Sequence, residues 1–135
     1  QVGIRDYCDE EFQVIQKSKG RVKTFFDRDL KIENMRGKTW EAQVNDIINE
    51  LPDKVYLSFD IDGLDPKLCP NTGTPVAGGF EFEQVLFLVE QVIKFGKELI
   101  GFDLNEVAPG KKDEWDANVG ARLLYRLCNL LGSQK

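Results

Sequence analysis

Two aspartates, Asp60 and Asp62, stand where a short apolar run gives way to turn residues. On an extended chain, side chains two positions apart point in the same direction. Two converging carboxylates repel each other unless a proton or a cation lies between them, and hard oxygen ligands favour Mg²⁺, Mn²⁺ or Ca²⁺. The spacing therefore indicates a divalent-cation site, although the same Asp-x-Asp-Gly run is also compatible with a plain turn. An EF-hand loop is excluded, because Leu64 and Asp65 break its ligand pattern.

A second pair of acids, Asp103 and Glu106, follows another apolar run. Two predicted strands thus end in acid, and the carboxyl ends of the strands are where an open α/β sheet binds its ligands. A turn acid and a helix-dipole partner would explain the second pair equally well. Thr74 lies in a polar turn, residues 72–75, which by itself says little about function.

The composition removes several kinds of chemistry. The 135 residues include no histidine, which excludes a histidine base, the usual catalytic triad and a His-ligated zinc site. The three cysteines are odd in number and widely spaced, so we expect free thiols in a reducing cytoplasm. A net charge of −5 disfavours nucleic acid as a partner. No apolar run approaches the ~20 residues that span a bilayer, so we expect no membrane partner either.

The acids must be positioned by alternating strands and helices. Apolar periodicity predicts strands at residues 2–6, 22–26, 54–60 and 99–104, and helices at 9–19, 39–51, 82–96 and 116–131. Residues 27–38 are expected to form a charged loop, and 63–80 a long ordered loop. Asp116 is expected to cap the last helix. This order predicts a single domain over residues 1–135, an α/β fold with three αβα layers around a mainly parallel sheet.

Several segments resemble one enzyme family, the ureohydrolases, which includes arginase, agmatinase, guanidinobutyrase and formimidoylglutamase. Ser-Phe-Asp-Ile-Asp-Gly-Leu-Asp-Pro at 58–66, with Thr-Gly-Thr-Pro at 72–75, is similar to a metal-binding motif of that family. Asp-Leu-Asn-Glu-Val-Ala-Pro at 103–109 is similar to its D-x-x-E-x-x-P segment, and residues 3–6 and 116–127 match more loosely. The resemblance implies an arginase-like fold truncated on its N-terminal side, with this chain as the C-terminal half.

The resemblance also implies an activity: hydrolysis of a guanidino or formimidoyl group, a C–N bond other than a peptide bond, which releases urea or formamide. Two Mn²⁺ ions would activate a bridging water in the complete parent protein. Asp60 would bridge both ions, Asp62 would bind one, and Asp62 and Thr74 would be the catalytic residues. Glu106 and Thr74 would contact a small cationic substrate. An exposed sheet edge is also compatible with a homo-oligomer.

Two histidine-bearing segments of the family, G-G-D-H and D-A-H-x-D, do not occur in this sequence. The chain would then hold two of six metal ligands, so we expect weak or absent manganese binding and no activity of the chain alone. Cys8 stands where arginases have an acidic residue, three positions after Arg5, which favours agmatine or another family substrate over arginine.

Two alternatives stay open. The chain could be a non-catalytic folded fragment or an interaction module. A lesser alternative is a haloacid-dehalogenase-like phosphatase, with Asp60 as nucleophile and Asp62 as acid–base; that motif has Thr or Val where Leu64 stands.

Overall fold

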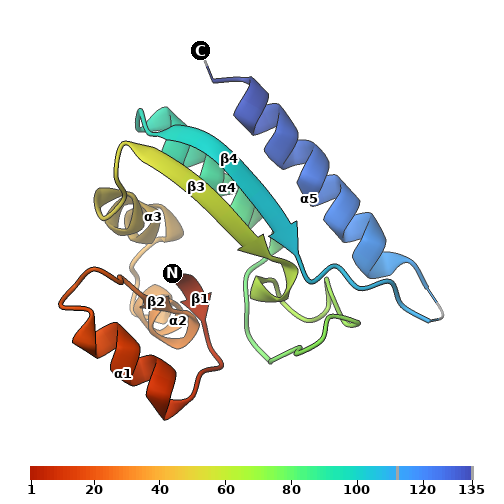
Figure 1. The fold of residues 1–135 in the computed structure, drawn as a ribbon, viewed down its shortest axis with the longest axis horizontal. Coiled ribbons are helices and arrows are strands. Elements are labelled where there is room, and N and C mark those ends of the chain that lie inside the picture. Colours follow the sequence, from red (N-terminus) through yellow and green to blue (C-terminus); the bar gives the residue numbers. More distant parts are fainter. Residues whose placement is uncertain (112, 135) are drawn as a thin grey trace. The chain divides into compact units, whose positions relative to one another are not determined.

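A computed structural model describes residues 1–111 and 113–134 of the chain. The chain forms two compact units, Gln1–Glu50 and Leu51–Lys135 (Figure 1). Each unit contains one pair of parallel strands. The single domain expected over residues 1–135 stays a prediction.

The first unit is built on a short strand pair, β1 (Val2–Ile4) and β2 (Phe25–Phe26). Helix α1 (Asp9–Lys17) lies between them in the sequence and buries no residue. Helices α2 (Asp27–Met35) and α3 (Trp40–Asn49) follow, and the Thr39 hydroxyl caps α3 by accepting the Ala42 backbone N–H at 3.2 Å. The predicted strand at 22–26 is therefore only two residues long.

The predicted loop at residues 27–38 is wrong, because helix α2 occupies most of it. Asp27 and Asp29 stand in the first turn, where acidic side chains interact favourably with the helix dipole. Lys31 bridges back to Asp27 at 2.9 Å, an i,i+4 pair that supports a helix. Leu30 is buried. Residues 27–38 contain few apolar residues, so hydrophobic periodicity does not predict a helix there. The charged side chains stabilise the helix instead.

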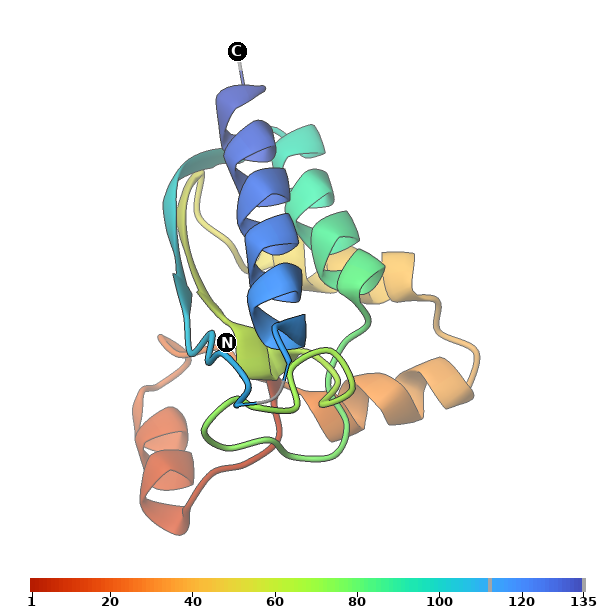
Figure 2. The ribbon, with the colours of Figure 1, turned by 90° about the vertical axis from the view of Figure 1, so that its right-hand side faces the viewer.

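The second unit is built on β3 (Lys54–Asp60) and β4 (Glu98–Asn105), which pair in parallel from Lys54 opposite Glu98 to Asp60 opposite Asn105. Helices α4 (Phe82–Lys94) and α5 (Trp115–Gly132) pack against β4 and against each other. Both helices lie on the same side of the strand pair (Figure 2). The side chains buried in this unit are largely aliphatic: Val85, Leu86, Val89, Val92, Leu99, Val119, Leu123 and Leu127.

The backbone edge of β4 at Leu99 is occupied by a side chain. The Leu99 N–H donates to Gln134 Oε1 at 2.6 Å, and Gln134 Nε2 donates to the Leu99 carbonyl at 2.8 Å. The Gln134 amide therefore satisfies the backbone N–H and C=O of one β4 residue, as a neighbouring strand would.

The long loop predicted at 63–80 is confirmed, after a 3₁₀ turn, η1 (Ile61–Gly63), that ends β3. The loop returns beside its own start, because the Asp65 N–H donates to the Phe80 carbonyl at 2.9 Å and the Phe80 N–H to the Gly63 carbonyl at 3.1 Å. Asp116 does not cap α5 as expected: it lies inside the helix and is fully buried. In the described part of the chain, no helix is both long and apolar enough to cross a bilayer.

Candidate functional site

Asp60 and Asp62 lie at the carboxyl end of β3, as the sequence predicts. Asp60 is the last residue of the strand and Asp62 lies in the 3₁₀ turn η1, where its backbone N–H donates to Asp60 Oδ1 at 3.1 Å. Asp60 therefore caps a turn as well as facing Asp62. Phe59 and Ile61 point into the core, with exposed fractions of 9% and 0%. Their burial leaves the two carboxylates at the surface.

The electrostatics of Asp60 show that carboxylates gather around it. Partial burial of its carboxyl raises the pKa of Asp60, and the negative charges of Asp62 and Glu106 raise it further. The Asp62 N–H bond opposes this shift by stabilising the charged form. Asp60 pairs with Asn105, so Glu106 follows at the same edge of the strand pair. Two neighbouring carboxylates thus act on Asp60, which favours a proton or a cation beside it.

The loop after β3 brings Thr74 to this cluster. The Thr74 hydroxyl donates to Asp62 Oδ2 at 3.1 Å. Two residues earlier, the buried Thr72 hydroxyl donates to the Glu106 carbonyl at 3.3 Å. One short segment therefore contacts both acidic strand ends. The sequence identifies Thr74 only through its family motif. Thr72 belongs to the same motif, but nothing in the motif indicates its partner, which lies 34 positions away.

Glu106 has an unusual backbone. Its φ is +61°, in the left-handed region that non-glycine residues rarely adopt, at a cost of about 1–2 kcal/mol. This conformation turns the chain sharply just after β4 ends at Asn105. The bond from Thr72 holds the peptide in that turn, and the site of a Cβ on Gly73 lies 3.6 Å from Glu106 Oε2.

Asp103 does not join the cluster. Its carboxylate lies across the strand pair from Ser58, whose hydroxyl donates to Asp103 Oδ1 at 2.8 Å, and Asn105 Nδ2 donates to the same oxygen. These bonds, that of Ser58 foremost and that of the Tyr56 hydroxyl among the others, lower the pKa of Asp103. The Asp103 carboxylate is therefore hydrogen-bonded within the β3–β4 pair.

The donor set fits part of a metal site. Asp60 and Asp62 offer the hard oxygen atoms that Mn²⁺ and Mg²⁺ accept. Burial first, and then the charges of Asp62 and Glu106, raise the pKa of Asp60. Over residues 1–111 and 113–134, no three His, Cys, Asp or Glu side chains are grouped as metal ligands. The three cysteines are free thiols, as predicted, and the buried Cys69 donates to the Ile61 carbonyl at 3.2 Å. The described residues thus offer two oxygen ligands at this edge, fewer than a complete cation site needs.

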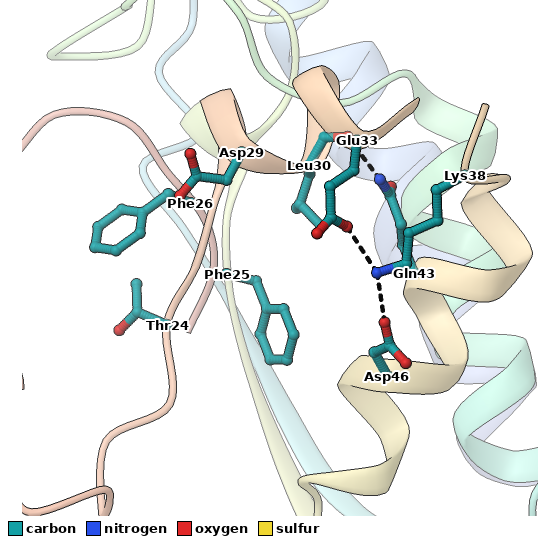
Figure 3. Close-up of a pocket in the computed structure, with 9 residues that line it drawn as sticks. All are labelled: Thr24, Phe25, Phe26, Asp29, Leu30, Glu33, Lys38, Gln43 and Asp46. Atoms are coloured by element: carbon teal, nitrogen blue, oxygen red, sulfur yellow. Dashed lines mark hydrogen bonds and ion pairs between the residues drawn. The ribbon is translucent and has the colours of Figure 1, made fainter. Parts of the chain in front are cut away.

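A separate cavity of about 170 Å³ lies in the first unit, between β2, α2 and α3 (Figure 3). Lys38 Nζ bridges Glu33 at 2.7 Å and Asp46 at 2.6 Å across it. The buried Gln43 donates to the Leu30 carbonyl at 2.6 Å. None of the predicted site residues lines this cavity.

Comparisons with known proteins identify the family of this chain. A model described as the arginase family matches residues 1–129. N(1)-aminopropylagmatine ureohydrolase of Thermococcus kodakarensis is 40% identical over 99 residues, which are 73% of this chain and 34% of that relative. Arginase-1 of Homo sapiens is 41% identical over 80 residues, 58% of this chain and 24% of that relative. The chain therefore spans about a third or less of these curated relatives.

The solved structure of arginase from Bacillus subtilis is similar with a TM-score of 0.74 and 25% identity, over 99% of this chain and 44% of that one. The predicted arginase-like α/β fold with parallel strands is thereby confirmed.

Proposed function

The chain belongs to the arginase family, and from this premise we propose that residues 1–135 carry part of the active site of a ureohydrolase, an enzyme that hydrolyses C–N bonds other than peptide bonds. Asp60 and Asp62 are its metal ligands, Asp62 and Thr74 its catalytic residues, and Glu106 and Thr74 its substrate contacts. The observation that carries the proposal is that Asp60 and Glu106 lie at the ends of neighbouring strands, at one edge. Asp62 bonds Asp60 through its backbone N–H, and Thr74 bonds the Asp62 carboxylate. Family membership also displaces the phosphatase alternative.

Each residue has a role that follows from its chemistry. The Glu106 carboxylate pairs with a cationic guanidinium or formimidoyl group through charge-assisted hydrogen bonds. Asp60 and Asp62 present oxygen ligands, and the Thr74 hydroxyl fixes one oxygen of Asp62. Manganese, when bound, supplies an acidified water for attack on the planar carbon. The left-handed backbone of Glu106 places this residue directly after the end of β4.

The substrate we propose is a guanidino compound of the agmatine type. Cys8 stands where arginases carry an acidic residue, which disfavours arginine. One similar relative is named for aminopropylagmatine, and another is named agmatinase, from Citrobacter koseri, at 39% identity over 95 residues. Two carboxylates leave most of a metal's coordination to water, so we propose that further ligands come from residues outside this sequence. The chain alone should bind Mn²⁺ weakly and release no urea at ordinary rates.

Manganese titration of the chain, followed by the electron paramagnetic resonance signal of free Mn²⁺, tests the proposal. Asp60→Asn and Asp62→Asn should each weaken binding about tenfold or more, the effect of losing one charged ligand worth about 1.4 kcal/mol. Asp103→Asn is the matched control, because Asp103 lies on the same strand pair outside the cluster. It should leave the affinity within about twofold.

Unchanged affinity in both Asp60→Asn and Asp62→Asn would overturn the assignment of the metal ligands. A urea-release assay with agmatine and arginine accompanies the titration. Manganese-dependent urea release by the chain alone would show that the site needs no further ligands. If the chain binds no manganese, the alternative of a non-catalytic folded fragment replaces the proposal.

A further inference from the structure

Asp116 is the most deeply buried charged residue among those that the structure describes, with an exposed fraction of 0%. It is the second residue of α5, and the first N–H of that helix is served by another acid, because the Trp115 N–H donates to Asp113 Oδ1 at 3.1 Å. A buried carboxylate is costly unless it is fully hydrogen-bonded. Its partners therefore indicate what it does.

Both oxygens of Asp116 bind one residue of the long loop. The Asn71 backbone N–H donates to Asp116 Oδ2 at 2.8 Å, and Asn71 Nδ2 donates to Asp116 Oδ1 at 2.8 Å. Bonds to a charged acceptor are roughly twice as strong as neutral ones. Two of them on one residue fix both the position and the orientation of Asn71, although 45 positions separate it from Asp116.

Asn71 in turn stands directly before the residues that contact the site. Thr72 donates to the Glu106 carbonyl, and Thr74 donates to Asp62. The segment after Glu106 also closes on Asn71, because a Cβ at Gly110 would lie 2.8 Å from Asn71 Nδ2. The buried carboxylate thus anchors the loop at the point from which it reaches both acidic strand ends.

Helix α5 makes a second close contact with the Glu106 turn. A Cβ at Gly120 would lie 2.8 Å from Val107 Cγ1, so the helix approaches the residue after Glu106 as closely as a glycine permits. One end of α5 therefore touches the loop through Asp116 and the turn through Gly120.

We propose that Asp116 is a positioning residue, which holds Asn71 and through it sets the places of Thr74 and Glu106. It touches neither the metal ligands nor the substrate contacts directly. A role of Asp116 in catalysis rests on the proposed function. Its hold on the position of Asn71 does not depend on that function, so this hold is tested separately from metal binding.

The test compares Asp116→Asn with the exchanged pair Asn71→Asp/Asp116→Asn. In the single variant an amide N–H₂ faces Asn71 Nδ2, so the charge-assisted bond is lost. Only a turnover of the Asn71 amide restores a bond there, and that bond is a weaker neutral one. In the exchanged pair the amide introduced at position 116 accepts the backbone N–H through its oxygen and donates to the carboxylate introduced at position 71, so both bonds are kept. Asp113→Asn is the matched control, since Asp113 is an acid at the same helix end that bonds only Trp115 among the residues described.

Hydrogen exchange measured by NMR gives the first readout. Asp116→Asn should speed exchange of the amides of residues 71–74, 76 and 106–108 by about tenfold or more relative to the β3–β4 amides. The exchanged pair should return them to within about threefold of the unmodified chain, and Asp113→Asn should leave them unchanged. Uniform acceleration of all amides, or no rescue by the exchanged pair, would overturn the positioning role.

Affinity for Mn²⁺ alone gives the second readout. Asp116→Asn should weaken it severalfold through the disturbed contact between Thr74 and Asp62. If the unmodified chain binds no manganese, the proposed function fails, while the exchange measurement still decides the positioning role. If Asp116→Asn does not fold, Asn71→Ser replaces it: this variant removes the side-chain bond and keeps the backbone N–H, and should also speed loop exchange selectively.

Discussion

Gly79 lies in very close contact with the backbone of another part of the chain. A Cβ there would lie 2.4 Å from the Leu64 carbonyl oxygen and 2.8 Å from the Asp65 nitrogen, and its φ is +87°. The contact closes the loop that carries Thr74, because Phe80 bonds Gly63 and Asp65 on either side of it. Gly79→Ala should therefore open the loop at its base.

The size of the effect follows from comparison with Gly96. Gly96 has a similar φ of +80° but nothing within 4 Å of its Cβ position, so Gly96→Ala carries only the backbone cost, about 1 kcal/mol. Gly79→Ala carries that cost and must also move the chain by about 1 Å, which either strains the contact or breaks two hydrogen bonds at about 1 kcal/mol each. We expect an additional loss of about 2–3 kcal/mol, a roughly 30- to 150-fold change in the folding equilibrium.

Equilibrium urea unfolding at pH 7 measures this difference. A Trp40→Phe background leaves Trp115 as the reporter of the second unit. Far-UV circular dichroism checks that both variants keep their helices. Equal losses in Gly79→Ala and Gly96→Ala would refute the reasoning, because the cost would then be conformational and the close contact would not matter.

Two further predictions concern the strand pair. Ser58→Ala should raise the pKa of Asp103 toward its ordinary 3.8, visible in a ¹³C NMR titration, with Tyr56→Phe giving a smaller shift. The lowered pKa of Asp103 stabilises the fold above about pH 4, and this contribution is lost on acidification. The free energy of unfolding of Ser58→Ala should therefore be lower at pH 7 and equal to that of the unmodified chain in acid. An unchanged pKa of Asp103 would contradict this. Gln134→Ala should speed exchange at Leu99 and promote self-association through the freed strand edge, measured by sedimentation, whereas Gln134→Glu, which keeps the acceptor, should do so less. A monomer with unchanged Leu99 exchange would contradict the role of Gln134.

The strand that carries the site could be predicted to the residue. Residues 54–60 combine apolar alternation with a sharp change to turn residues, and β3 has those bounds. The position of Asp60, Asp62 and Glu106 at strand ends follows from the same pattern. Their mutual approach needs the parallel register of β3 and β4, which the sequence suggests only through the α/β order.

The anchoring residues could not be predicted because their partners are distant in sequence. Asp116 has the local sequence of a helix cap, and nothing near it indicates Asn71 as its partner. Helix α2 was not predicted for a different reason. An ion pair and one buried leucine stabilise it, and hydrophobic periodicity does not detect such a helix.

At position 106, the residue that would be best for stability differs from the residue that the proposed activity needs. A glycine there would release about 1–2 kcal/mol of strain and would remove the carboxylate that we propose for substrate binding. Selection for a more stable chain alone would therefore replace this glutamate. A chain engineered only for heat resistance would therefore be expected to lose the proposed substrate contact at this position.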